Sequence, residues 1–237
     1  MRTILFFFSF ITALAIQAQD SSSKRINVNN LKDGSREKLM SVVFKYPEFV
    51  SSRLVYRDNA VMEAKLNYHR LNEQMFFING KGDTMILAQP ELFSMFILNQ
   101  DTFFYADKSY AYLITHYPEV NLAKKESISL VGKEKKGAYG TYSAVSSVNS
   151  ERTFTTDEMP QVTWLNLDEN AVYKKESKFL LMDRHRNSFT ATKKNLYNLF
   201  SKQEKELKDY LQKNKVDLSN EKDLLALFSF LNGENKE

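Results

Sequence analysis

Cysteine is absent from the 237-residue sequence, and this absence excludes several kinds of chemistry at once. The chain has no disulfide, no thiolate metal ligand, no cysteine nucleophile and no cysteine to carry a bacterial lipid anchor. Glycine and proline are scarce, with 7 and 4 residues, which argues against collagen-like, low-complexity or long linker segments. A chain of this length can instead fold around an ordinary apolar core.

Charge of one sign is not concentrated anywhere along the chain. Lysine and arginine number 33 and acidic residues 29, so the formal net charge is +4, and the two signs are interspersed. This is the pattern of a solvated surface. A nucleic-acid-binding protein usually shows a basic stripe or a recognisable module, so no nucleic-acid partner is expected.

Long apolar runs are also lacking, except at the N-terminus. Arg2 is followed by the apolar run at residues 4–16, and then by Gln17, Ala18 and a polar stretch. A basic residue, a short apolar run and a small residue before a polar boundary are typical of a secretory signal peptide, and the run is short for a bilayer span. We predict cleavage after Ala18, which leaves 219 residues with a formal charge of +3 and no transmembrane anchor.

Four regions follow from the composition along the chain. They are a signal peptide at residues 1–18, a polar, flexible leader at 19–35, a β-rich domain at 36–191 and a C-terminal helical segment at 192–237 that packs on the sheet. Residues 35–46, at the start of the β-rich domain, fit either a short helix or a strand.

Short antiparallel strands are the main signal in the first half of the β-rich domain. Between Met62 and Tyr68, apolar side chains alternate with Glu63, Lys65 and Asn67, which is the period of two expected of a half-buried strand. Polar turn sequences separate further short apolar runs, at residues 57–59, 79–83 and 99–101.

The second half of the β-rich domain is less regular. We predict a strand within residues 122–133, around Ile128 and Leu130, and further strands within residues 162–168 and 171–184. The glycine- and serine-containing stretch at residues 137–150 is predicted to be a long loop.

The last forty-odd residues change from a period of two to the period of a helix. Thr192 can cap a first helix, the capping-box sequence SKQE at residues 201–204 can begin a second, and Asn220 or Ser219 can begin a third that stops at residues 232–233. Helices this short are marginal alone, so we expect them to pack on the sheet rather than to serve as a docking module for a partner.

The predicted fold class is α+β and mainly β. An antiparallel meander that forms a curved sheet and a two-sheet sandwich both fit the strand pattern, in each case followed by three short C-terminal helices. The sequence does not choose between these two arrangements.

No catalytic residue, metal site or cofactor can be assigned from motifs. His69, His116 and His185 lie far apart and show no metal-ligand spacing, and no serine-nucleophile motif occurs in a supporting context. Several carboxylates fall on or beside the predicted strands and leave a hydrolase open, namely Glu48, Asp58, Glu63, Asp83 and Asp107.

Two turn regions supply candidate binding residues. Asn67, Tyr68 and Arg70 begin a stretch that mixes amides, an aromatic ring and both charges, and loops carry a large share of binding residues. Tyr139 and Tyr142 lie in the predicted loop, where their rings can stack on a sugar or peptide or simply cover the edge of the core.

Several sequence runs resemble a group of uncharacterised exported proteins common in Bacteroidota. YPEF at residues 46–49, EQMFFI at 73–78 and GDT at 82–84 are similar to the front half of that group. GAYG at residues 137–140 and YLQKN at 210–214 are similar to its back half. The resemblance covers most of the mature chain and implies a bacterial source and a shared fold, but the group has no assigned activity.

The leading functional hypothesis is therefore an exported, non-enzymatic protein of the bacterial envelope that binds a protein or glycan component. Its place can be the periplasm, the outer surface or the medium, and the oligomeric state stays open. The alternative is a glycan or peptide hydrolase with dispersed carboxylates.

Overall fold

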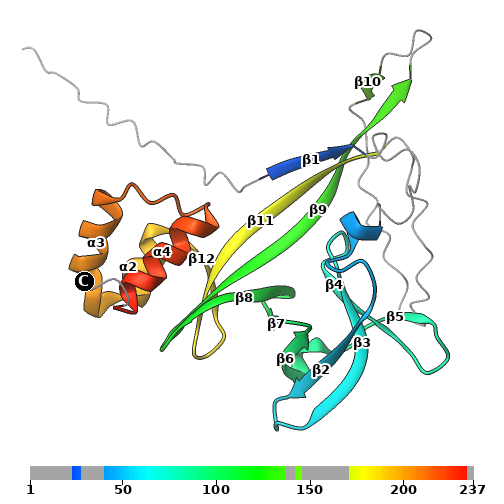
Figure 1. Ribbon diagram of the computed structural model, residues 1–237, viewed down its shortest axis with the longest axis horizontal. Coiled ribbons are helices and arrows are strands. Elements are labelled where there is room, and N and C mark those ends of the chain that lie inside the picture. The colour runs from blue at the N-terminus through cyan, green and yellow to red at the C-terminus, as the bar shows by residue number, and fades with distance from the viewer. Residues whose placement is uncertain (1–22, 28–39, 137–141, 146–170, 234–237) are drawn as a thin grey trace, which may run out of the picture.

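The computed structural model describes residues 23–27, 40–136, 142–145 and 171–233 (Figure 1). The predicted signal peptide, the candidate residue Tyr139 and the strand predicted within residues 162–168 lie outside the described residues.

Twelve strands in the described part form one antiparallel sheet, in which ten follow the order β1-β11-β9-β8-β7-β6-β2-β3-β4-β5. These ten are β1 (Ser23–Asn27), β2 (Val50–Tyr56), β3 (Val61–His69), β4 (Gln74–Ile78), β5 (Thr84–Ile86), β6 (Phe93–Leu98), β7 (Asp101–Ala106), β8 (Ser109–Tyr117), β9 (Val120–Lys136) and β11 (Ala171–Asp183). In addition, β10 (Tyr142–Val145) pairs with β9, and β12 (Ser188–Thr190) pairs with β11. The predicted mainly-β α+β class is confirmed, with one curved, open sheet rather than a sandwich.

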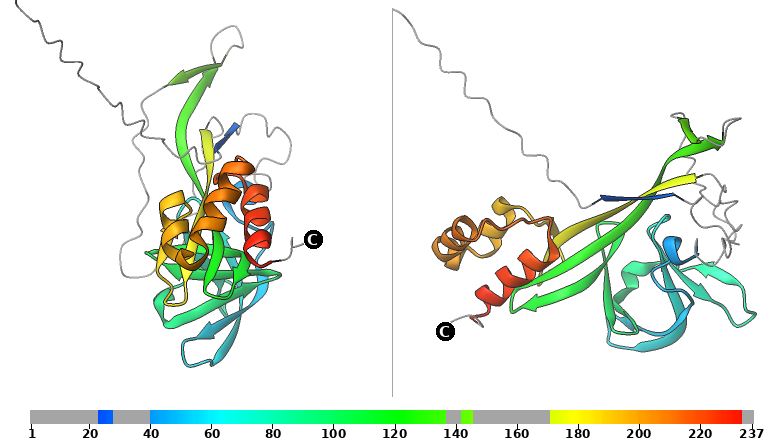
Figure 2. Two further views of the ribbon diagram at one scale, coloured as in Figure 1. Left: turned by 90° about the vertical axis from the view of Figure 1, so that its left-hand side faces the viewer. Right: turned by 45° about the horizontal axis from the view of Figure 1, so that its top comes forward.

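The long paired strands β9 and β11 run diagonally through the view of Figure 1, with the C-terminal helices at one end and a curled part of the sheet beside their middle (Figures 1 and 2). Strands β8, β7, β6, β2, β3 and β4 make this curl. The curl encloses a core rich in aromatic side chains, among them Tyr68, Phe96, Phe103 and Tyr110. The face of the sheet that carries these side chains is called the inner face below.

The end of the curl returns to β9. The Ile128 N–H donates to the Arg70 carbonyl over 3.1 Å, so the turn after β3 contacts the strand that lies five places away in the sheet order. Residues 40–49, called the strap below, pass beside this junction (Figure 1). Residues 40–43 are helical, as one of the two predicted alternatives had it, and Phe44 then forms an isolated β-bridge with His69.

The strap has its own small apolar core. Val43 and Phe44 pack with Phe76 of β4, Ile128 of β9 and Tyr173 of β11, and all five side chains are buried. The strap therefore joins the end of the curl to the long paired strands through side-chain packing as well as through the bridge.

The C-terminal helical segment consists of α2 (Lys193–Leu199), η3 (Ser201–Gln203), α3 (Glu204–Lys213) and α4 (Glu221–Leu231). Apolar residues such as Leu196, Leu207 and Leu227 pack with Leu122 of β9 and Leu181 of β11 in one buried cluster. The helices thus bury their apolar stripes against the chain's own sheet. In the described part of the chain, no helix combines the length and apolar character needed to cross a bilayer.

Two of the three predicted helix caps are confirmed. The Thr192 hydroxyl accepts from the Asn195 N–H, and the Asn220 side chain accepts from the Lys222 N–H. The predicted capping box at Ser201 is wrong, because Ser201 lies inside a 3₁₀ turn and α3 begins at Glu204 without a side-chain cap. A capping serine needs an extended backbone just before the helix, and this turn does not provide it.

Two short strands lie in stretches where the sequence pattern indicates none. β1 falls within residues 19–35, predicted as a leader, and pairs with β11. β10 falls within the predicted loop at 137–150 and pairs with β9, with Tyr142 opposite Lys136. Both strands extend the edges of longer strands through backbone hydrogen bonds, which do not require an alternating apolar pattern.

Candidate functional site

Glu126 lies on the inner face of β9, at the point where two apolar clusters meet. On this face Leu122 belongs to the core beneath the helices and Ile128 belongs to the core beneath the strap, with Lys124 and Glu126 between them. Glu126 is only 5% exposed. A carboxylate at such a depth requires strong polar partners to remain charged.

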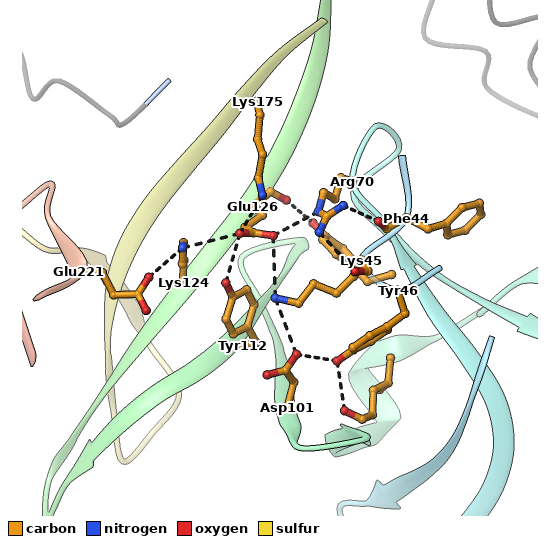
Figure 3. A network of polar contacts seen from close by, with 12 residues as sticks. Phe44, Lys45, Tyr46, Arg70, Asp101, Tyr112, Lys124, Glu126, Lys175 and Glu221 are labelled. Atoms are coloured by element: carbon orange, nitrogen blue, oxygen red, sulfur yellow. Dashed lines mark hydrogen bonds and ion pairs between the residues drawn. The ribbon is translucent and has the colours of Figure 1, made fainter. Parts of the chain in front are cut away.

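Four cations and a hydroxyl group supply those partners within the described residues (Figure 3). The distances to the Glu126 carboxylate oxygens are 3.1 Å from Arg70 Nε, 3.2 Å from Lys175 Nζ, 3.6 Å from Lys124 Nζ, 3.9 Å from Lys45 Nζ and 3.2 Å from the Tyr112 hydroxyl. These groups come from the strap, the turn after β3, and strands β8, β9 and β11. Glu126 thus joins parts of the chain that are far apart in sequence.

Two further carboxylates balance the outer side of this charge cluster. Lys45 Nζ lies 3.7 Å from Asp101 Oδ2, and Lys124 Nζ lies 2.8 Å from Glu221 Oε2 at the start of α4. Asp101 also accepts from the Tyr46 hydroxyl over 2.6 Å (Figure 3). The four cations and three carboxylates therefore leave a small excess of one positive charge.

The electrostatic environment keeps Glu126 ionised. Burial alone raises the pKa of this carboxyl, but Lys45, Lys175, Arg70 and Lys124 together lower it to about 2. Burial also lowers the pKa of Lys45, an effect that Glu126 and Asp101 oppose. A general acid needs a raised pKa, so Glu126 in this setting is a structural counterion rather than a proton donor.

Three of the sequence-predicted binding residues meet at the strap. Asn67 accepts from the Tyr46 N–H over 3.1 Å and donates to the carbonyls of Tyr46 and Glu48 over 2.9 and 3.0 Å. The Tyr68 hydroxyl donates to the Glu126 carbonyl over 3.0 Å, and Arg70 pairs with the Glu126 carboxylate. All three side chains are buried and bind the chain itself, whereas Tyr142 belongs to β10.

The outer face of β3, β2 and β6 carries a different arrangement of charge. A shallow hollow of about 390 Å³ is lined by Ser51, Ser52, Arg53, Glu63, Ala64, Lys65, Ile97 and Asn99. The strand register places the short side chain of Ser51 beside Lys65 and places Arg53 between Glu63 and Ile97. The long side chains of Arg53, Glu63 and Lys65 therefore stand around the short side chain of Ser51, and the space above Ser51 forms the hollow.

The charged groups of the hollow are exposed and available. Arg53, Glu63 and Lys65 are all exposed, and among the described residues none of the three has an ion pair or side-chain hydrogen bond. Glu63 is one of the candidate carboxylates of the sequence analysis, whereas no sequence motif marks Arg53. The alternation of residues 62–68 predicts that Glu63 and Lys65 lie on one face of their strand. The sequence does not predict that β2 pairs with this strand and brings Arg53 beside Glu63.

The histidines do not form a site. His69 is buried beside Phe44 and Phe76, His116 contacts Asn121, and His185 lies in the turn between β11 and β12. Across the part of the chain that the structure describes, no three residues of metal-ligating type come together.

Sequence reasoning missed Glu126, although a signal for it was present. Along β9 the inward positions read Val120, Leu122, Lys124, Glu126, Ile128, so two charges interrupt an otherwise apolar face. The predicted strand at residues 122–133 includes both charges, but it rests on Ile128 and Leu130 and assigns no face to Lys124 or Glu126. The alternation from Val120 to Ile128 places both charges on the buried face and hence makes them candidates for a polar cluster.

Comparisons with known proteins add no functional assignment. No family model, no curated protein and no solved structure matches the chain. Function therefore has to be inferred from the chemistry of the described residues.

Proposed function

We propose that this chain is an exported, non-enzymatic protein of the bacterial envelope that binds a glycan component of that envelope on the outer face of β3, β2 and β6. The predicted signal peptide and the resemblance to exported proteins of Bacteroidota support the location. The periplasm, the outer surface and the medium are all compatible with this function.

The hollow on the outer face is the observation that carries the proposal. Arg53 and Glu63 are direct neighbours across β2 and β3, yet they make no ion pair with each other. By contrast, the charges around Glu126 are paired with one another inside the molecule. Groups without partners on the chain are free to bind a ligand.

The lining of the hollow suits a polar ligand with a negative charge. Arg53 and Lys65 supply two cations against the one carboxylate of Glu63, and Ser51 and Asn99 add neutral hydrogen-bonding groups. Arginine binds carboxylates in a two-point geometry that lysine does not reproduce. A glycan that carries carboxylates, as cell-wall polymers do, matches this set of groups better than an apolar peptide does.

Sedimentation with insoluble cell-wall sacculi tests the proposal. The mature wild-type protein should co-sediment with the sacculi at physiological salt, and the double variant Arg53→Ala, Lys65→Ala should lose at least about tenfold in affinity, because each charged contact contributes about 1.5–3 kcal/mol. The matched control is Lys202→Ala, Lys205→Ala, which removes two exposed cations from the helical segment.

Two results would contradict the proposal. Equal retention of both double variants would show that binding does not use the outer hollow. Absence of retention on sacculi, together with one dominant protein partner after crosslinking in cells and affinity purification, would replace the glycan by a protein ligand.

A further inference from the structure

The strap is held by a pair of side chains that bind its backbone. Arg70 donates to the carbonyls of Ser41, Val42 and Lys45 over 3.2, 3.0 and 3.4 Å, and also to the carbonyl of Phe44. Asn67 binds the backbone of the strap further along, at Tyr46 and Glu48. These contacts attach an irregular segment to the sheet without a continuous strand pairing.

His69 lies directly beneath the strap. Its ring is 2% exposed and lies between Phe44, at a centroid distance of 4.7 Å, and Phe76, at 4.8 Å. The ring atom Nδ1 accepts from the Asn72 N–H over 3.1 Å, so the buried ring against which Phe44 of the strap packs is neutral and carries no proton on Nδ1. Protonation at Nδ1 would remove this hydrogen bond and place a positive charge between two phenyl rings.

Within the described residues, no acidic side chain pairs with His69 to offset such a charge. Phe44 packs on the ring from the strap and Phe76 from β4, and within the described residues no charged side chain makes an ion pair or hydrogen bond with it. The adjacent Arg70 faces Glu126, which is also bound by Lys45, Lys124, Lys175 and Tyr112. Burial accordingly lowers the pKa of His69 to about 4.

We propose that the strap is an acid-released element, which leaves the junction between the curl and the long paired strands when His69 takes up a proton. The strap contributes two of the five buried side chains of its core, so its release uncovers Phe76, Ile128 and Tyr173. The remaining sheet need not open, because its strands pair with each other, whereas the strap pairs with the end of β3 only through the isolated bridge between Phe44 and His69 and its flanking backbone hydrogen bonds.

The expected pH window follows from the two states of His69. A released ring has an ordinary pKa near 6.5 and a docked ring one of about 4, so proton uptake favours release as the pH falls from about 6.5 to 4. Glu126 stays ionised across this window because its pKa is about 2. The ratio of released to docked strap should rise roughly 50-fold between pH 7 and pH 4.5.

Hydrogen exchange on the full mature chain tests this directly. The amides of Lys45 and Arg70, which bond across the strap and the end of β3, report release, and amides of the β8 and β9 pairing serve as the internal reference. After correction for the intrinsic pH dependence of exchange, the strap amides should lose roughly 50-fold in protection from pH 7 to 4.5 while the reference amides keep theirs.

Variants separate the role of His69 from general acid sensitivity. His69→Gln keeps an acceptor for the Asn72 N–H without titrating, and should abolish the response. His69→Phe, which suits the aromatic surroundings, provides a second non-titrating side chain should the first fold poorly. His116→Gln is the matched control, since His116 is exposed and lies on another strand, and it should respond as the wild type does.

Three results would overturn the proposal. Unchanged protection of the strap amides in the wild type would show that the strap stays docked. An equal loss in strap and reference amides would mean that the whole fold opens. A wild-type response in both His69 variants would assign the pH dependence to another group.

Discussion

Two regions of this molecule hold charged side chains on the same sheet and use them in opposite ways. Around Glu126, on the inner face, each charge lies within 4 Å of an opposite charge and is largely shielded from water. In the outer hollow, Arg53, Glu63 and Lys65 are exposed and have no ion partner among the described residues. The number of charged side chains in a region therefore does not distinguish a structural cluster from a candidate binding surface. The distinction lies in whether the charges are buried and whether they form ion pairs within the chain.

The different energetics of the two regions explain this contrast. A buried charge without a partner costs several kcal/mol, so the inner cluster must be satisfied for the fold to form. An exposed charge costs almost nothing without a partner, because water screens it. Only the outer charges can therefore be reserved for another molecule without a loss of stability.

The largest effect is expected from Glu126→Gln, which removes the common partner of four cations. We expect a loss of about 3–5 kcal/mol in the free energy of unfolding, measured by urea denaturation, because uncompensated buried charge remains. The matched control is Glu176→Gln on β11, where a more exposed ion pair joins Glu176 to Lys174 over 2.7 Å. That control should cost less than about 1 kcal/mol. Similar losses of unfolding free energy in both variants would show that the buried cluster around Glu126 contributes no more to stability than an exposed ion pair.

Acid should weaken the inner cluster in a defined pH range. The pKa of Glu126 is about 2 in the folded chain against the ordinary value of 4.5, so its contribution is fully present above pH 4.5 and is lost as the pH falls towards 2. The loss amounts to about 3 kcal/mol. Measured as the difference in unfolding free energy between the wild type and Glu126→Gln, the gap should narrow over this range; a constant gap would contradict the assignment.

Three tyrosines of the inner face give a finer comparison. The hydroxyls of Tyr112 and Tyr68 donate to the side chain and to the carbonyl of Glu126, whereas the buried hydroxyl of Tyr110 has no partner in the described part of the chain. Substitution of Tyr112 or Tyr68 by Phe should cost about 1–2 kcal/mol of unfolding free energy. Tyr110→Phe should be neutral or stabilising, since no hydrogen bond is lost. An equal cost at all three positions would show that packing, and not hydrogen bonding, sets the effect.

The local chemistry of the chain was largely predictable from its sequence. The sequence predicts Thr192 as one helix cap and either Asn220 or Ser219 as another, because a cap depends on a few adjacent residues; the structure has Thr192 and Asn220. The alternation before Tyr68 identified β3 for the same reason. The mainly-β α+β class followed from the change of period near residue 192.

The inner cluster was not predictable, because it depends on contacts between distant segments. Arg70 and Glu126 are 56 positions apart, and they meet only because the curl returns to β9. Asn67, Tyr68 and Arg70 were selected as polar turn residues, which said nothing of burial. The strap that covers them has no regular secondary structure beyond residue 44, so no periodic pattern in the sequence predicts its position.

The smallest effect on stability is expected in the outer hollow. Arg53→Ala and Lys65→Ala, singly or together, should change the unfolding free energy by no more than about 0.5 kcal/mol, because exposed side chains without partners contribute little to the fold. Urea denaturation checks this on the same samples that are used for sedimentation with sacculi. A large loss of stability would mean that these cations serve the fold, and any loss of binding would then have a structural cause. Unchanged stability with lost binding would instead assign the two faces of the sheet to different tasks, the inner charges to holding the curl and the outer charges to recognition.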